Sequence, residues 1–349
     1  MLPVRLAPNA IEHFYRGGAR IAELRGSTPA SERQPEEWVA ATVSRFGGDD
    51  TGLARTEDGR LLRDLVAADP DRWLGVEAAA TPRAGAADTG LLLKLLDAGQ
   101  RLPVHVHPDR GFAVRHLGCP YGKTEAWYVL DADPGAVVHL GWTEDVDRDE
   151  LAERRDAQDS GWMLSRMHRV PVRPGDGILV PAGQAHAIGE GVFIAEAQEP
   201  TDFSIVLEWS VTSSGRDDSH LGIGFDTAMR AVSHRALAAD RLAALCRHTD
   251  PGARSSALRP VLPDAADEFF RLALLGGDAA TERVDPGFAA VVVLDGDGVL
   301  IGTDEVPVRR GELLAVPAAF GSWSVRGARL VVARPGVDWP HGLVAGVDR

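Results

Sequence analysis

Short apolar segments separated by turn residues recur along most of the chain. Four of them are rich in Val, Leu and aromatic residues, at 91–99 (LLLKLLDAG), 103–107 (PVHVH), 124–130 (TEAWYVL) and 136–141 (AVVHLG). A fifth, at 289–302 (AAVVVLDGDGVLIG), carries Asp-Gly-Asp-Gly at its centre, which is typical of a hairpin turn. Short, turn-bounded segments of this kind predict antiparallel β-strands.

One of these patterns occurs twice. Residues 170–183 read VPVRPGDGILVPAG and residues 306–319 read VPVRRGELLAVPAA, so the two align without gaps. Each copy predicts a strand, a turn at Gly175 or Gly311, a second apolar strand and a proline-containing turn. The repeat predicts two related β-barrels of the jelly-roll type in one chain.

Two segments between the strands have helical patterns. Residues 146–158 are charged all round, which predicts a surface helix, and residues 226–247 have apolar positions at helical spacing, which predicts a helix packed between or beside the barrels. Residues 248–260 contain Pro, Gly and Ser and predict the domain boundary. We therefore expect an N-terminal domain at 1–247 and a C-terminal domain at 248–349.

Composition narrows the setting and the partners. The 349-residue chain has a formal net charge of −14, which argues against nucleic acid and anionic membranes but not against a small anionic substrate. No apolar stretch approaches the roughly 20 residues of a membrane span, and the first residues do not resemble a signal peptide. With two cysteines, the chain is expected to be cytoplasmic and to keep free thiols.

Four residues have the character and spacing of metal ligands. His105 and His107 are two apart on a predicted strand, so both side chains leave the same face. Glu125 begins the next strand, and His186 ends a G-x5-P-x-G-x2-H sequence, which is the second motif of the cupin barrel. The sequence thus predicts a mainly β, double-cupin fold whose single metal site combines His105, His107, Glu125 and His186.

Three imidazoles and one carboxylate suit a divalent first-row metal and leave positions for water or substrate. In the second copy of the repeat, Ser322 stands at the position of His186, and no His-x-His precedes it. We expect the C-terminal barrel to be structural and without metal.

Several longer blocks resemble one family. These blocks are LLLKLLDAGQRLPVHVHPD, YGKTEAWYVLDADPGA, RPGDGILVPAGQAHAI and EAQEPTD, with weaker similarity upstream in FYRGGARIAEL and PEEWVAATV. On these blocks the chain resembles the type I phosphomannose isomerases, also called mannose-6-phosphate isomerases. The resemblance extends over nearly the whole chain.

The resemblance implies a zinc-dependent aldose–ketose isomerase that acts on a phosphorylated hexose. In that family the metal ligands are a glutamine, two histidines and a glutamate, which correspond here to His105, His107, His186 and Glu125. His105 replaces the glutamine, so Fe, Mn, Ni or Co could serve in place of Zn²⁺.

The resemblance and the chemistry also indicate residues that contact the sugar. Moving a proton between C1 and C2 requires a polarised carbonyl and a base of suitable pKa. Lys123, one of only two lysines in the chain, and Asp202 are the candidates for proton handling. The candidates for substrate binding are Arg16, Glu36, Trp38 and Glu196.

One departure from the family concerns the substrate. Family members carry a Tyr-Arg pair after these elements, whereas this chain has Ile205 and Val206. A phosphate group would then need another cation, and the nearest candidates in the sequence are Arg16, Arg20 and Arg115.

Three alternatives to this reading are considered. The first is an isomerase or epimerase for a different sugar, phosphorylated or not, which is suggested by the missing arginine. The second is a cupin that binds a sugar or a metal without catalysis. The complete ligand set, together with Lys123 and Asp202, argues against it. The third is a cupin dioxygenase, which the GKTEAWY context disfavours. The sequence leaves the oligomeric state open.

Overall fold

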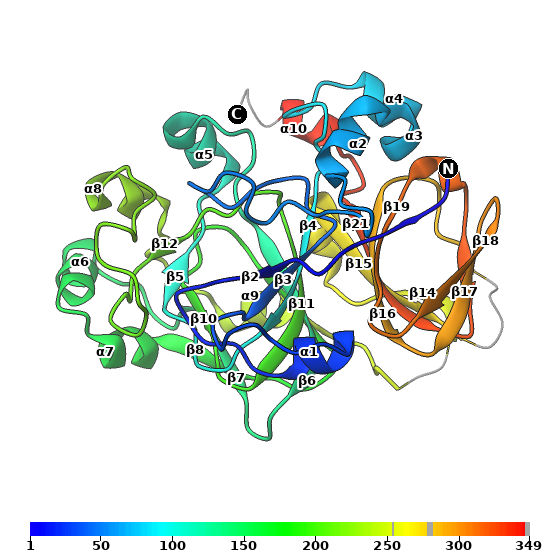
Figure 1. Cartoon of the computed structure of the whole chain (residues 1–349). Coiled ribbons are helices and arrows are strands. Elements are labelled where there is room, and N and C mark those ends of the chain that lie inside the picture. The colour runs from blue at the N-terminus through cyan, green and yellow to red at the C-terminus, as the bar shows by residue number, and fades with distance from the viewer. Residues whose placement is uncertain (253–254, 278–281, 346–349) are drawn as a thin grey trace.

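The strands form four antiparallel sheets that pair into two barrels (Figure 1). The computed structural model describes residues 1–252, 255–277 and 282–345. The first barrel combines a seven-stranded sheet with a five-stranded one, and the second barrel combines a six-stranded sheet with a three-stranded one. The predicted mainly β, double-cupin architecture is confirmed.

The first barrel contains the segments in which the metal ligands were predicted. The seven-stranded sheet has the order β13 (Cys246–His248), β9 (Asp176–Val180), β6 (Glu125–Ala132), β11 (Val192–Gln198), β4 (Leu92–Asp97), β3 (Glu36–Val39) and β2 (Ala10–Ile11). The five-stranded sheet has the order β12 (Ile205–Val206), β5 (His105–Val106), β10 (His186–Ile188), β7 (Val137–Trp142) and β8 (Met167–Pro171).

The second barrel lies beside the first in Figure 1. Its larger sheet has the order β1 (Val4–Arg5), β19 (Leu313–Val316), β16 (Ala289–Asp295), β21 (Arg329–Pro335), β15 (Phe270–Gly276) and β14 (Ser255–Pro260). Its smaller sheet has the order β18 (Glu305–Arg309), β17 (Asp297–Ile301) and β20 (Ser324–Arg326). Strand β1 comes from the opposite end of the chain, so the proposed division at residue 247 stays a prediction.

The two copies of the repeat occupy equivalent places. Both contain a turn glycine with a left-handed backbone, Gly175 at φ +95° and Gly311 at φ +85°, where a side chain would be strained. In each barrel the strand after this glycine, β9 or β19, pairs with a long strand of the larger sheet, β6 or β16. The predicted repeat therefore corresponds to the same structural unit in both barrels.

Helices are short and lie outside the barrels. They are α1 (Arg20–Arg25), α2 (Leu62–Ala68), α3 (Pro70–Leu74), α4 (Val76–Ala80), α5 (Arg110–Leu117), α6 (Arg148–Asp156), α7 (Ser160–Ser165), α8 (Phe225–Ala228), α9 (Ala239–Ala244) and α10 (His341–Ala345). Three 3₁₀ turns occur at η1 (Met229–Ala231), η2 (Asp264–Glu268) and η3 (Ala318–Phe320). Helix α6 confirms the predicted helix within 146–158, although Leu151 and Arg155 in it are buried.

The segment 226–247 does not form one continuous helix, because two short helical parts are separated by non-helical backbone. Only α8, η1 and α9 are helical, and Cys246–His248 pairs with β9 as a strand. Between the helical turns the backbone amides of Leu237 and Val146 bond to the carbonyls of Trp142 and His234. These contacts with the first barrel replace the hydrogen bonds that a continuous helix would make.

Alternation along the strands separates two apolar cores. On β4, Leu93 and Leu95 face the second barrel, where they pack in one core with residues of β15, β16, β19 and β21. Leu96 faces the interior of the first barrel, together with residues of β6, β7, β9 and β10. Because side chains alternate along a strand, Lys94 also projects to the interior side.

A glycine marks the closest approach of the barrels. A Cβ on Gly177 of β9 would lie 1.8 Å from the carbonyl oxygen of Val261, which leads into the second barrel. Gly177→Ala should therefore lower the free energy of unfolding by about 1–3 kcal/mol, measured by denaturant unfolding. A matched Gly85→Ala change, where nothing lies within 4 Å of the new Cβ, should cost less than about 0.5 kcal/mol. Equal effects would contradict a close contact at Gly177.

Candidate metal centre and pocket

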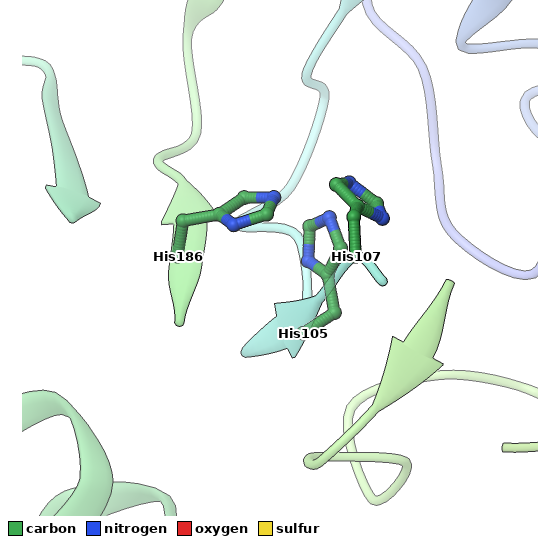
Figure 2. Close-up of side chains that lie close together, drawn as sticks. All are labelled: His105, His107 and His186. Atoms are coloured by element: carbon green, nitrogen blue, oxygen red, sulfur yellow. The ribbon is translucent and has the colours of Figure 1, made fainter. Parts of the chain in front are cut away.

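Three imidazole rings converge inside the first barrel. Figure 2 shows His105, His107 and His186 turned towards one another from two strand segments. His186 on β10 pairs directly with His105 on β5, so both side chains leave the same face of the sheet. One nitrogen from each ring lies within 4.8 Å of the others. The predicted three-histidine cluster is thus brought together by the fold.

Backbone carbonyls orient all three rings. The Nδ1 atoms of His105, His107 and His186 lie 2.9, 2.7 and 2.9 Å from the carbonyl oxygens of Pro103, Phe203 and Gln184. Each Nδ1 therefore carries the proton and donates it to a carbonyl. The three Nε2 atoms keep their lone pairs, which is the arrangement that a metal-binding histidine requires.

Glu125 completes the cluster from the other sheet. Its Oε2 lies 2.9 Å from His107 Nε2 and its Oε1 lies 3.3 Å from His186 Nε2. Trp127 Nε1 donates a hydrogen bond of 3.0 Å to Oε1, which fixes the carboxylate. Nε2 and a carboxylate oxygen are both acceptors, so each pair needs a cation or a donor beside it. The Lys123 ammonium contacts both acceptors of the His107 pair, whereas His186 Nε2 has no donor among the described residues.

The residues present therefore fit a metal. His186 Nε2 is a buried nitrogen without a hydrogen-bond partner among the described residues. Lone pairs from three imidazoles and one carboxylate, all turned to one region, are a suitable donor set for zinc. In the second barrel, Ser322 Oγ instead accepts a hydrogen bond from Arg283 Nε at 3.1 Å, and a metal-free second barrel stays a prediction.

Burial and neighbouring charges set the protonation of the ligands. Burial, reinforced by Lys123, lowers the pKa of His107 to about 3, and burial together with His186 holds the pKa of His105 well below its usual value. Burial alone would raise the pKa of Glu125, but Lys123 and His107 outweigh it and hold that pKa well below its usual range. His105, His107 and Glu125 are thus in their metal-binding forms at neutral pH.

Lys123 lies beside the ligands. Its Nζ is 2.5 Å from Glu125 Oε2, 2.8 Å from His107 Nε2 and 3.7 Å from Glu196 Oε1. Glu196 projects from β11, and its burial, together with the charge of Glu125, raises its pKa to about 8. The carboxyl group of Glu196 is therefore protonated at neutral pH and can donate a hydrogen bond.

Lys94, Glu36 and Asp202 form a second ion-paired group. Lys94 Nζ lies 3.2 Å from Glu36 Oε2 and 3.3 Å from Asp202 Oδ1. Trp38 Nε1 donates to Glu36 Oε2 at 2.9 Å. Tyr15 donates its hydroxyl hydrogen to the other oxygen of Glu36. Burial would raise the pKa of Glu36, but the charges of Lys94 and His13 outweigh the effect of burial and keep this pKa below its usual value.

These groups surround one pocket of about 450 Å³, part of which is open to solvent. Its polar lining residues are His13, Tyr15, Glu36, Lys94, His105, Lys123, Glu125, Glu196, Asp202 and Ser204. Its apolar lining includes Leu96, Leu102, Ile188 and Val206. Val206 pairs with His105 across β12 and β5, so it stands next to that imidazole.

Some predicted site residues take other places. Arg16, whose Nε lies 3.3 Å from Gln100 Oε1, is not in the pocket lining. Arg20 pairs with Asp97, Asp131 and Asp133. Arg115 lies in the last turn of α5, and neither it nor Arg20 lines the pocket. Trp38 contacts Glu36 and does not line the pocket itself.

The sequence reasoning missed His13 and Tyr15. Both line the pocket and both contact Glu36, His13 through Nε2 at 3.5 Å from Glu36 Oε1. The sequence offers one signal for them: Tyr15 lies in the block FYRGGARIAEL, and His13 lies just before that block. Lys94, one of the two lysines in the chain, also lines the pocket.

Comparison with known proteins finds mannose-6-phosphate isomerases. No family model matches the chain. A mannose-6-phosphate isomerase from Streptococcus mutans serotype c is 31% identical over 247 residues, which are 70% of this chain and 73% of that protein.

Solved structures share the fold. The mannose 6-phosphate isomerase of Bacillus subtilis matches with a TM-score of 0.71 and 23% identity over 96% of this chain and 100% of that one. A mannose 6-phosphate isomerase bound with zinc and yttrium matches with a TM-score of 0.71 and 16% identity over 97% and 100% of the two chains. In the described part of this chain no helix has the length and apolar character that a membrane crossing requires.

The metal centre predicts a loss of affinity on removal of one ligand. His107→Ala should weaken zinc binding by more than the 10- to 100-fold that typically follows loss of an outer-shell partner. Competition with a chelator of known affinity measures this change. His139→Ala is the matched control, since His139 pairs with Ala187 on the opposite face of β10 from His186. Unchanged zinc affinity in the His107 variant would contradict the site.

Proposed function

Since the chain belongs to the mannose-6-phosphate isomerase family, we propose that it interconverts mannose 6-phosphate and fructose 6-phosphate. The reaction is a metal-dependent aldose–ketose isomerisation by proton transfer through an enediol. The observation that carries the proposal is the cluster of three oriented imidazoles and Glu125 at the wall of a pocket lined by further acid and base groups.

The proposed metal is Zn²⁺, although the donor set would also accept Fe, Mn, Ni or Co. His105, His107, Glu125 and His186 would hold it through three Nε2 atoms and a carboxylate oxygen. When bound, a metal of this kind supplies Lewis-acid polarisation of the sugar carbonyl.

Lys123 and Asp202 are the proposed proton-handling residues. The Lys123 ammonium is buried between Glu125 and Glu196, so it can hold a proton at a sugar oxygen next to the metal ligands. Asp202 Oδ1 is tied to Lys94, and its side chain is 13% exposed at the pocket lining. Asp202 can therefore take a proton from, or orient, a sugar hydroxyl on the outer side.

Two further carboxyl groups would bind the sugar. Glu196, with its pKa raised to about 8, would donate a hydrogen bond to a hydroxyl group. Glu36 is ionised and would accept one, held in place by Trp38 and Lys94. The proposed setting is the reducing cytoplasm, which is supported by the free thiols of Cys119 and Cys246.

The test is an isomerisation assay on zinc-loaded protein with mannose 6-phosphate and with mannose. We expect fructose 6-phosphate to form, and we expect the activity to be lost with a chelator and restored by zinc. A preference for free mannose in kcat/KM would favour an isomerase of unphosphorylated sugars. No turnover of either sugar by the zinc-loaded protein would contradict the proposal.

The Lys123→Met variant is a second arm of the same assay. It removes the ammonium but keeps most of the side-chain volume, so kcat should fall by roughly 10²–10⁴-fold, the usual contribution of acid–base catalysis. Zinc content, measured by elemental analysis, should stay unchanged. If kcat equals that of the unmodified protein, Lys123 does not take part in the proton transfer.

A further inference from the structure

The charges lining the pocket leave no spare cation for a phosphate group. Four carboxyl groups line it, from Glu36, Glu125, Glu196 and Asp202, but only two ammonium groups do so. Lys94 is engaged by two carboxylates at 3.2 and 3.3 Å. Lys123 is engaged at the metal ligands. A phosphate dianion buried there without another cation would be strongly disfavoured.

Arg45 does not itself line the pocket but lies next to Asp202, which does. Its Nε lies 3.9 Å from Asp202 Oδ2, which makes it the only arginine of residues 1–252, 255–277 and 282–345 within 4 Å of a carboxylate that lines the pocket. The Arg45 side chain is 31% exposed, so its charge is reachable from solvent. Burial lowers the pKa of His13, a lining residue, to about 4, and the charge of Arg45 acts in the same direction.

One edge of the Arg45 guanidinium remains available. Its Nη1 donates a hydrogen bond of 2.9 Å to the carbonyl oxygen of Glu12. Its Nη2 has no hydrogen-bond partner in the described part of the chain, and at 3.9 Å its Nε is too far from Asp202 for a hydrogen bond. The Nε–Nη2 edge therefore presents two parallel N–H groups, the geometry that binds a phosphate through two oxygens.

The turn that carries Arg45 packs against Phe203, whose carbonyl group orients the imidazole of His107. The backbone amides of Arg45 and Gly48 bond to the carbonyls of Thr51 and Arg45 at 2.8 and 2.9 Å. The ring of Phe46 packs edge-on against Phe203 at 5.4 Å between centroids. The carbonyl of Phe203 in turn accepts the hydrogen bond from His107. Arg45 is thus fixed relative to the reactive end of the pocket.

We propose that Arg45 binds the phosphate group of the sugar at the outer end of the pocket and so sets the preference for phosphorylated over free sugars. The inference rests on the proposed isomerase function. The carbonyl end of the sugar lies at the imidazoles, and Lys94 and Asp202 lie between the two ends. Asp202 attracts the guanidinium by its charge, and at 3.9 Å from Nε it is too far away to take up the N–H groups of the Nε–Nη2 edge.

The test compares Arg45→Gln and Arg45→Lys with the unmodified zinc-loaded protein. For mannose 6-phosphate, kcat/KM of Arg45→Gln should fall by about 10- to 100-fold, mainly through KM, which is the usual effect of losing hydrogen bonds to a charged group. For free mannose, kcat/KM should change by less than about threefold. Arg45→Lys should recover part of the loss, because an ammonium keeps the charge but not the two-point geometry.

Arg173→Gln is the matched control. Arg173 is an exposed arginine whose Nε lies 3.8 Å from Asp176 Oδ1, in a turn that does not line the pocket. It should leave both substrates unaffected. A loss in Arg45→Gln that is equal for mannose and its phosphate, or a change below about threefold for the phosphate, would overturn the inference.

A binding measurement separates this inference from the proposed function. Calorimetric titration with mannose 6-phosphate should show binding to the unmodified protein and a 10- to 100-fold weaker affinity in Arg45→Gln. If the unmodified protein binds the sugar phosphate but does not convert it, the isomerase function fails while the role of Arg45 stands. If both proteins bind it equally, the role of Arg45 fails whatever the activity.

Discussion

Glu125 is an ionised carboxylate that is almost completely buried, with 2% of its surface exposed. Such a charge is unfavourable by several kcal/mol unless other charges and hydrogen bonds compensate it. Lys123 and Trp127 donate hydrogen bonds to its two oxygens, and the Nε2 atoms of two histidines lie beside them as further acceptors. Removal of Lys123 or Trp127 would leave the charge less compensated, so the strands that carry these groups have to keep one register.

The second barrel contributes to that register from outside. The strands β4, β6 and β11 place Lys94, Glu125 and Glu196 on one face and small or apolar side chains on the other. The outer face packs on β15, β16, β19 and β21 through one apolar core. A sheet that is packed on both faces cannot shift by one residue without moving its charged groups into that core. The second barrel thus stabilises the first barrel, which carries the histidine cluster.

Residue spacing in the sequence predicted those features of the site that depend only on residues close together in the chain. The spacing of His105 and His107, and the turn motif that leads to His186, require only strand alternation and a glycine turn, and both are present. The helix predicted over 226–247 failed because contacts with the first barrel, which the spacing does not reveal, took its backbone hydrogen bonds. That Arg16 lies outside the pocket lining, and that Arg45 lies beside the lining residue Asp202, could not be predicted for a similar reason. Their positions depend on how the N-terminal loops fold over the barrel.

The central claim is that the fold itself orients three imidazoles and one carboxylate for a single metal ion. Zinc K-edge X-ray absorption on protein loaded with one equivalent of zinc measures the ligands directly. We predict a shell of nitrogen and oxygen atoms at about 2.0–2.2 Å, with the outer-shell scattering of three imidazoles. A shell that contains sulfur, or scattering from fewer than two imidazoles, would contradict the claim.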